Sequence, residues 1–226
     1  MNFSVLISLY YKEKPQFLME CLESLKKQTL QATEIVIVFD GIITSELEEM
    51  VMQYISILPI KIIRLLKNVG LGKALNEGLK HCSYNWIFRM DTDDICLPDR
   101  FKKQVEFIKQ HPNVVLFSGH IAEFSDDKTK IIGYRKVPIG DKNIKKYALS
   151  RSPFNHMTVA FRKDIIEAVG GYQHHLFLED YNLWLRVIAQ GYEVGNIDEV
   201  LLLARAGSNM VARRRGKDYI KGEWKL

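Results

Sequence analysis

The stretch Trp86-Ile87-Phe88-Arg89-Met90-Asp91-Thr92-Asp93-Asp94 decides more about this chain than any other. A mostly apolar run leads directly into three carboxylates, those of Asp91, Asp93 and Asp94. Ionised carboxylates at short range repel one another, so their position where a buried strand should end predicts a bound cation. Mg²⁺ or Mn²⁺ fits best, because these ions prefer oxygen ligands and usually bind together with a substrate phosphate. The alternative is an acidic surface loop.

A calcium loop of the EF-hand type does not explain the carboxylates. Such a loop starting at Asp91 would need an oxygen ligand at its fifth position, Gly at its sixth and Glu at its twelfth. The chain has Ile95, Cys96 and Lys102 at these positions.

The first half of the chain alternates strand-like and helix-like segments. Apolar, strand-like runs lie at 3–9, 34–39, 60–66 and 85–90, and helices are expected to begin at Pro15, at a capping box on Ser45, at Gly70 and at Pro98. This order predicts an α/β fold with a parallel sheet covered on both faces. Ligands of such sheets bind beyond the carboxyl ends of the strands. The polar residues that stand out lie at these ends: Ser8, Tyr10, Asp40, Asn68 and the carboxylates after Met90.

The second half is expected to be less regular. Short strands are predicted at 114–118 and 121–124, followed by a hairpin strand at 131–137. A further strand at 158–161, helices at 163–169 and 179–190, and a strand at 192–197 complete the prediction. No repeat and no clear linker divides the chain, so a single domain with two halves is expected.

Composition is that of an ordinary globular protein, with 226 residues, 47% of them apolar and 26% charged. No apolar run reaches the length of a membrane span, and residues 1–11 lack the basic leader and cleavage site of a signal peptide. Three cysteines without metal-ligand spacing favour reduced thiols in a cytoplasmic protein.

The net charge of +5 comes from the last 22 residues. Residues 205–226 contain seven Lys/Arg and two Asp/Glu, whereas residues 1–204 contain 25 of each sign. A basic segment that also has Tyr219 and Trp224 suits an anionic lipid surface, a nucleic acid or an anionic substrate. A solvated helix face is the alternative.

The chain ends at Leu226 without a helix-ending signal, which leaves open whether it is truncated.

Two polar segments of the first half suggest nucleotide contacts. Asp40 follows a buried strand, where a carboxylate can accept an N–H of a base or a ribose hydroxyl, although a turn Asp before Gly is common. Residues 68–73 resemble a phosphate loop but lack Gly-Lys-Ser/Thr, which excludes a P-loop NTPase. Lys73 is either a phosphate contact or a surface lysine.

Two segments of the second half suggest acceptor contacts. His156 either donates to a diphosphate or an acceptor hydroxyl, or is a structural histidine. Glu179 and Asp180 open a helix, where acidic residues are favoured by the helix dipole in any case. A carboxylate there would also suit a general base beside an acceptor hydroxyl.

Several ordered motifs together resemble glycosyltransferase family 2, over roughly residues 3–208. The motifs are residues 5–10 with the helix that ends at residue 29, Glu34 to Gly41, Asn68 to Gly78, Arg89 to Asp94 with Pro98-Asp99-Arg100, Gly170-Gly171-Tyr172 and Glu179 to Trp184. The resemblance implies a GT-A fold, with a nucleotide-sugar-binding half at 1–112, an acceptor-binding half at 113–204 and a basic C-terminal segment at 205–226. It also implies inverting transfer from a nucleotide-sugar with Mn²⁺ or Mg²⁺.

By motif position, the resemblance assigns roles to single residues. Leu9, Tyr10 and Asp40 would hold the base, Asp91 the ribose or sugar, Asp93 the metal, and Asp180 would act as the catalytic base. Asp94 is expected to support its loop through Arg100. The rest of the expected nucleotide-sugar site is Ser8, Asn68, Lys73, Arg89 and Thr92, and the expected acceptor or diphosphate contacts are His156, Glu179 and Arg205.

The expected reaction adds one sugar, because the Gln-x-x-Arg-Trp of processive members is absent. The family habit favours a UDP-sugar donor and a polyprenyl-diphosphate-linked saccharide acceptor of a bacterial surface polysaccharide, at the inner face of the cytoplasmic membrane, with no nucleic-acid partner. Two alternatives stay open. A metal-dependent nucleotidyltransferase would want a Gly-rich basic loop after the first strand, where this chain has Tyr10 to Glu13. A non-catalytic nucleotide- or glycan-binding protein would not need both Asp93 and Asp180.

Overall fold

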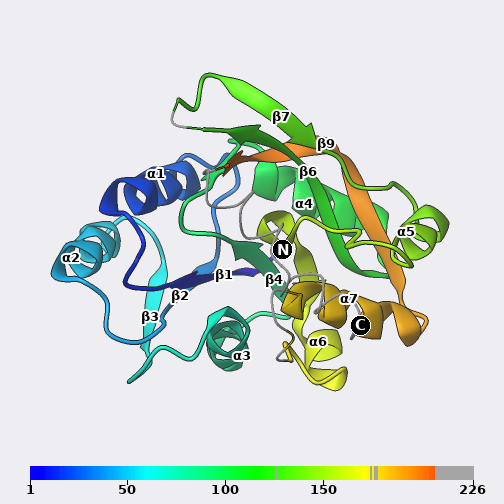
Figure 1. Cartoon of the computed structure of the whole chain (residues 1–226), viewed down its shortest axis with the longest axis horizontal. Helices are drawn as coiled ribbons and strands as arrows, with labels where there is room; N and C mark the ends of the chain where they lie inside the picture. Colours follow the sequence, from blue (N-terminus) through cyan, green and yellow to red (C-terminus); the bar gives the residue numbers. More distant parts are fainter. Residues whose placement is uncertain (126, 174, 176–177, 207–226) are drawn as a thin grey trace, which may run out of the picture.

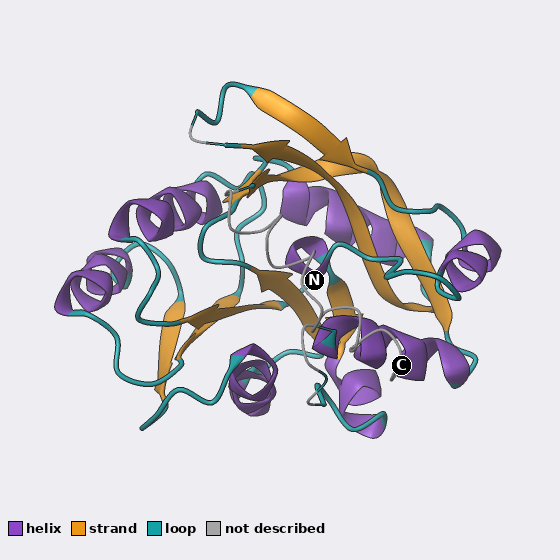
Figure 2. Cartoon of the chain, in the orientation of Figure 1, coloured by secondary structure: helices purple, strands orange, loops and turns teal. Residues whose placement is uncertain are grey.

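A computed structural model describes residues 1–206 except 126, 174, 176 and 177. The described residues form one mixed sheet of nine strands, flanked by helices (Figures 1 and 2). The first half contains β1 (Ser4–Leu9), α1 (Pro15–Lys26), β2 (Glu34–Phe39), α2 (Ser45–Tyr54), β3 (Ile60–Arg64), α3 (Leu71–His81) and β4 (Trp86–Met90). The second half contains β5 (Ile95–Cys96), α4 (Arg100–Gln110), β6 (Val114–Phe124), β7 (Ile131–Arg135), α5 (Asp141–Tyr147), the 3-10 turn η1 (His156–Thr158), β8 (Ala160–Arg162), α6 (Lys163–Ala168), α7 (Glu179–Ala189) and β9 (Glu193–Arg205).

The strand order confirms the α/β prediction. It is β3-β2-β1-β4-β8-β6-β9-β5, with β7 paired to β6. Strands β1 to β4 are parallel to one another, whereas β8 runs antiparallel to both β4 and β6. Strands β1, β2 and β4 are mostly apolar and buried because helices cover both faces of this part of the sheet.

Two apolar cores lie on opposite faces of the sheet. Helices α1, α2 and α4 pack on one face, through side chains such as Leu22, Val51 and Phe101. Helices α3, α5, α6 and α7 pack on the other, where Trp184 is fully buried. No helix among the described residues is both long and apolar enough to cross a membrane.

Several predicted elements differ from the observed ones. The capping residue of α2 is Thr44, whose hydroxyl accepts the Leu47 N–H at 3.4 Å, so the capping box on Ser45 is wrong by one residue. Helix α4 begins at Arg100 and not at Pro98. The two short strands at 114–118 and 121–124 are one strand, β6, because β9 pairs along its whole length.

Strand β9 and helix α5 also differ from the prediction. The strand predicted at 192–197 extends to Arg205, because the polar pair Asp198-Glu199 is accommodated at an irregularity in the pairing with β6. Helix α5 was not expected, since it has seven residues and buries only Ile144, which leaves no periodic pattern to read.

Candidate active site

The register of the parallel strands brings three predicted site segments to one edge. Leu9 pairs with Phe39, and Ile7 pairs with Met90, so the residues that follow these strands lie side by side. These residues are Tyr10, Asp40 and Asp91. The edge is the one predicted to bind ligand, because it is formed by the carboxyl ends of the strands.

Arg89 and Asp91 form a bidentate ion pair, in which Nη1 of Arg89 donates to Oδ2 of Asp91 and Nη2 contacts Oδ1. Arg89 is buried, at 2% exposure, whereas the side chain of Asp91 is 31% exposed. Alternation along β4 places residues two apart on the same side, so this pair could have been expected from the sequence. The ion pair fixes the orientation of the Asp91 carboxylate at the mouth of the site.

Asp93 forms no ion pair with a described residue, in contrast to Asp91. Its pKa is raised to about 7 by burial and by the nearby charges of Asp91 and Glu13. Glu13 also accepts a hydrogen bond from the hydroxyl of Thr92, a contact that sequence reasoning missed. A half-buried carboxylate beside other carboxylates is stabilised by a cation, so Asp93 fits the chemistry of a Mn²⁺ or Mg²⁺ ligand.

Asp94 supports the loop through a different partner from the one expected. Its Oδ1 accepts the backbone N–H of Arg205 at 3.0 Å. Arg100 instead donates to the carbonyl of Arg89 at 2.6 Å and to Gln104 at 3.1 Å. The predicted contact between Asp94 and Arg100 is therefore wrong.

The side chain of Arg205 is buried against α1 and the carboxylate loop. Its guanidinium pairs with Glu20, donates to the carbonyl of Asp93 at 3.2 Å and lies 3.8 Å from the ring centre of Phe17. The side chain is 8% exposed. These contacts join Arg205 to the carboxylate loop, and its contact with a diphosphate stays a prediction.

The three carboxylates of Asp91, Asp93 and Asp94 have different surroundings. Among the described residues, no group of three or more His, Cys, Asp or Glu side chains is arranged to hold a metal ion. Asp91 is paired with Arg89 and Asp94 with a backbone N–H. Asp93, the residue expected to bind the metal, therefore stays the candidate ligand, and further oxygen ligands would be needed to complete the site.

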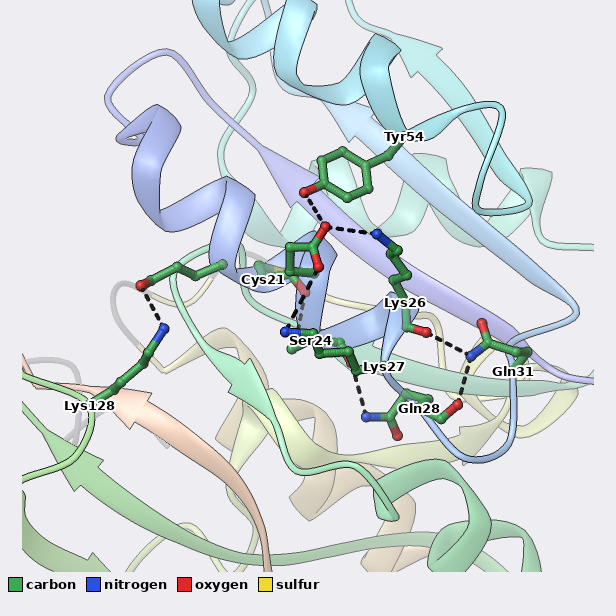
Figure 3. Close-up of polar contacts among 10 residues, drawn as sticks. Cys21, Ser24, Lys26, Lys27, Gln28, Gln31, Tyr54 and Lys128 are labelled. Carbon is green, nitrogen blue, oxygen red and sulfur yellow. Dashed lines mark hydrogen bonds and ion pairs between the residues drawn. The ribbon is translucent and has the colours of Figure 1, made fainter.

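Helix α1 fixes the backbone of the carboxylate loop. Cys21 Sγ lies 3.4 Å from the carbonyl of Asp91, Ser24 Oγ accepts the Cys96 N–H at 3.0 Å, and Gln28 Nε2 donates to the carbonyl of Leu97 at 2.8 Å. Figure 3 shows the side chains of Cys21 and Ser24 on α1, Gln28 just after the helix, and Lys128 of the β6–β7 hairpin, which donates to Glu20 of α1. The loop is therefore held from both of its ends.

Asp40 shapes the segment that was expected to bind phosphate. Its carboxylate accepts the N–H of Val69 at 2.7 Å, the N–H of Gly70 at 3.1 Å and Nδ2 of Asn68 at 3.0 Å. Gly41 follows with φ of +86°, and a Cβ there would lie 2.5 Å from the Asn68 nitrogen. Both oxygens of Asp40 are thus engaged by residues 68–70, and its direct contact with a base stays a prediction.

The other residues predicted to bind the nucleotide-sugar differ in how exposed their side chains are. Tyr10 is 40% exposed beside the strand ends, whereas Leu9 is fully buried and can offer a ligand only its backbone. Ser8 is half-buried in β1, and Lys73 is exposed on α3. The roles of these residues stay predictions.

The first turn of α7 lies against the first turn of α3. A Cβ on Gly72 would meet Cβ of Tyr172 at 3.3 Å and Cγ of Glu179 at 3.7 Å. The side chain of Asn76 binds the backbone of Tyr172 on both sides, at 2.8 Å to its N–H and 2.7 Å to its carbonyl. Residues about 100 positions apart in the sequence are thereby joined at one side of the site.

Asp180 lies in this first turn and is half-buried. Burial raises its pKa, and the neighbouring charge of Glu179 adds to the increase, while the positive charge of Arg89 acts in the opposite direction. Arg89 also acts on the pKa of Asp93. The two candidate carboxylates, far apart in sequence, are therefore both within the electrostatic range of the same buried guanidinium.

His156 is part of an aromatic cluster. Its Nε2 lies 2.9 Å from the hydroxyl of Tyr172, and its ring centre is 5.9 Å from that of Trp184. Burial, together with the charge of Arg89, lowers the pKa of His156 well below its usual value. A neutral ring held in this way favours the structural alternative over a charged donor to a diphosphate.

Comparison with known proteins shows the family of the chain. Residues 4–170 match the model of the family described as "Glycosyl transferase family 2". The chain belongs to glycosyl transferase family 2. The predicted family is therefore confirmed.

Curated relatives resemble the chain over nearly its full length. It is 54% identical to an uncharacterised glycosyltransferase of Haemophilus influenzae, over 100% of this chain and 84% of the relative. It is 50% identical to the amylovoran biosynthesis glycosyltransferase AmsE of Erwinia amylovora, over 99% of this chain and 84% of the relative. It is 40% identical to the UDP-Gal:alpha-D-GlcNAc-diphosphoundecaprenol beta-1,3-galactosyltransferase of Escherichia coli, over 99% of this chain and 81% of the relative.

Solved structures share the GT-A fold. S. aureus TarS in complex with UDP-GlcNAc superposes with a TM-score of 0.72 at 23% identity, over 94% of this chain and 61% of that chain. The mannosyltransferase PcManGT of Pyrobaculum calidifontis, in complex with GDP-Man and Mn²⁺, gives 0.74 at 16% identity, over 99% of this chain and 63% of that chain. This chain thus spans about 60% of the TarS fragment, and the likeness confirms the predicted fold. The expected basic segment lies outside the described residues beyond Ala206.

Proposed function

We propose that this protein transfers one sugar from a nucleotide-sugar, a UDP-sugar in the first instance, to a hydroxyl of a saccharide acceptor, with inversion at the anomeric carbon. One observation carries the proposal. Two half-buried carboxylates, Asp93 after β4 and Asp180 at the start of α7, are both near enough to the buried Arg89 for its positive charge to lower their pKa. Such a site offers one carboxylate for a metal ion and another for a proton.

The donor would bind along the edge formed by β1, β2 and β4, in the half of residues 1–112. Tyr10 and the segment ordered by Asp40 would contact the base, and Asp91, oriented by Arg89, would accept a hydrogen bond from a sugar or ribose hydroxyl. Further contacts would come from Ser8, Asn68, Lys73 and Thr92. Asp93 would hold Mn²⁺ or Mg²⁺, and the ion when bound neutralises charge on the departing diphosphate.

The acceptor would bind in the half of residues 113–204, with its reacting hydroxyl beside Asp180 and near Glu179. Asp180 takes the hydroxyl proton while the acceptor oxygen attacks the anomeric carbon and the bond to the diphosphate oxygen breaks. A base works best when its pKa is near the operating pH, so the raised pKa of Asp180 suits this role. A single displacement of this kind inverts the anomeric centre.

The acceptor class is inferred from relatives. The E. coli relative at 40% identity is named for a lipid-diphosphate-linked acceptor, and AmsE for the synthesis of the polysaccharide amylovoran. We extend this to the present chain as a saccharide linked to a polyprenyl diphosphate, used to build a surface polysaccharide such as O-antigen, capsule or exopolysaccharide. The acceptor lipid would place the enzyme at the inner face of the cytoplasmic membrane.

Thermal unfolding with ligands tests the donor site. UDP together with Mn²⁺ should raise the melting temperature by more than the sum of the separate shifts, because each ligand completes the site of the other. Asp93→Asn should abolish this synergy, whereas the control Asp127→Asn, in the β6–β7 turn, should keep it. Synergy that survives Asp93→Asn would place the metal elsewhere, and absence of synergy in the natural protein would contradict the donor site.

A further inference from the structure

A second feature of the chain is the uneven charge of its described part. Residues 127–151 contain eight Lys/Arg and two Asp, a net charge of +6, whereas residues 1–126 and 152–204 together have a net charge of −6. This segment comprises β7, the connection to α5, and α5 itself, along the outer margin of the molecule beyond β6 (Figure 1). Residues 1–204 have a net charge of zero, but they include this strongly basic segment.

The same segment is rich in exposed apolar side chains. It contributes five of the thirteen large apolar side chains that are exposed among the described residues, including Ile132 at 61%, Tyr134 at 63% and Leu149 at 86%. Isolated exposed apolar residues are ordinary, but a group of them within a basic region indicates an interaction surface. We call this surface the basic rim, and define it by the exposed side chains of Ile132, Tyr134, Lys136, Ile139, Lys142, Lys146, Leu149 and Arg151.

Tyr134 and α5 lie on the same side of the sheet. Phe117 and Ile121 of β6 face the core formed with α1, α2 and α4, so by strand alternation Ala122 faces the opposite side. Tyr134 is paired with Ala122 and shares its side. Helix α5 packs on that side through Ile144.

The lysines of α5 point away from the protein. Lys142 and Lys146 each lie two residues from the buried Ile144, which places them on the opposite side of the helix. Other basic residues of the segment are paired, as Lys128 is with Glu20 and Lys145 with Asp141. Lys136, Lys142 and Lys146 form no ion pair with a described residue, so their charge is available to a partner.

The rim is held in place by buried polar side chains. Asn155 donates to the carbonyl of Arg135 at 3.2 Å, and Asn196 donates to the carbonyl of Pro138 at 2.8 Å. Asp141 accepts the N–H of Val194 at 3.1 Å. Because the backbone is fixed before any partner arrives, little ordering would be needed on binding.

We propose that the basic rim is a docking surface for an anionic phospholipid bilayer. Lysines contribute to binding at the headgroup phosphates, and isoleucine, leucine and tyrosine side chains enter the boundary between headgroups and acyl chains. Aliphatic side chains among the lysines favour a lipid surface over a nucleic acid, which would be met by stacking aromatic and charged groups. The rim lies on the same side of the sheet as α7, which bears Asp180. On the proposed function, a lipid-linked acceptor would therefore reach Asp180 from the side that faces the membrane. The membrane docking itself does not depend on the proposed function.

Vesicle binding by the full chain tests the proposal. Co-sedimentation would compare vesicles of phosphatidylcholine with vesicles of phosphatidylcholine and phosphatidylglycerol at equal parts. The rim variant Lys136→Glu/Lys142→Glu/Lys146→Glu should bind the anionic vesicles about 100-fold more weakly than the natural chain, given about 1 kcal/mol for each basic residue. The matched control Lys27→Glu/Lys102→Glu/Lys109→Glu changes the net charge equally on α1 and α4 and should lose less than about tenfold. Both keep residues 205–226.

The apolar part of the rim has its own test. Tyr134→Ser/Leu149→Ser should weaken the binding that persists at high salt, whereas the control Met52→Ser/Ile57→Ser on the α2 side should not. Equal loss in the rim and control charge variants, or no vesicle binding by the natural chain, would overturn the proposal. Tighter binding to single-stranded DNA than to vesicles, lost in the rim variant, would overturn it in favour of a nucleic acid. The shift given by UDP with Mn²⁺ should be unchanged in both rim variants, so failure here is distinct from failure of the proposed function.

Discussion

The guanidinium of Arg89 is buried and is neutralised by the carboxylate of Asp91, which lies at the solvent-facing side of the same ion pair. The two partners therefore differ in what their loss would leave behind. Without Asp91, the buried guanidinium loses the carboxylate with which it forms its ion pair. Without Arg89, a carboxylate remains that is 31% exposed and can be hydrated. The pair is thus asymmetric in its contribution to stability.

We predict that Asp91→Asn destabilises the protein on the order of 3 kcal/mol, because breaking a buried ion pair by removing one partner is expensive. Arg89→Met should cost clearly less, since it removes the buried charge and leaves a hydrated one. Urea unfolding of both variants measures the difference. As a control, Glu48→Gln, which breaks the exposed pair between Glu48 and Arg64, should cost less than about 1 kcal/mol. A larger cost for Arg89→Met than for Asp91→Asn would contradict the asymmetry.

A second prediction concerns Asp40. Asp40→Asn should destabilise the protein by about 2 kcal/mol, because the amide group would direct N–H donors at the N–H groups of Val69 and Gly70. It should also weaken UDP binding by disordering residues 68–70. Asp99→Asn, at the exposed end of α4, serves as the control. Calorimetric titration with UDP and urea unfolding measure both effects, and a stable variant with normal affinity would show that the loop does not depend on Asp40.

The sequence predicts the parallel half of the fold well for a physical reason. Strands buried on both faces are continuous apolar runs, and the helices between them bury one stripe each, so β1 to β4 and α1 to α3 can be recognised from periodicity. The long pairing of β6 with β9 could not be recognised, because Gly119 and the polar pair Asp198-Glu199 look like breaks. Local pattern does not show that a partner strand tolerates them.

The candidate site is predictable in part for a similar reason. Strand ends that converge can be inferred from a parallel sheet, which places Asp40 and Asp91 together. The three carboxylates after β4 look alike in sequence, and only the structure separates Asp93, which forms no ion pair with a described residue, from Asp94, whose partner is a backbone N–H 111 residues away. A contact to a backbone group has no residue signature, so the partner expected for Asp94 was the wrong one.

A third prediction uses the depressed pKa of His156. The folded protein holds this ring neutral, whereas the unfolded chain protonates it near pH 6.5, so the unfolded state binds more protons below that pH. The free energy of unfolding should therefore fall as pH drops below about 6.5, by up to about 1.4 kcal/mol per pH unit from this residue. His156→Gln should flatten the decline between pH 6.5 and 5, and the exposed control His111→Gln should keep it. An equal slope in His156→Gln and the natural chain would show that the ring is not held neutral.

The last prediction separates binding from chemistry at Asp180. Asp180→Asn keeps the shape of the side chain, but the amide cannot take up the proton of the acceptor hydroxyl. The rate of sugar transfer should therefore fall by about 10²- to 10⁴-fold. The shift in melting temperature given by UDP with Mn²⁺ should be unchanged, because the donor site lies on the strand ends and not on α7. Glu179→Gln, one residue earlier in the same helical turn, is the matched control and should lose less activity. Transfer from a UDP-sugar to a lipid-linked saccharide measures the rates. Near-normal turnover in Asp180→Asn would assign the proton to another group, and equal losses in the two variants would indicate that the turn positions the acceptor without supplying the base.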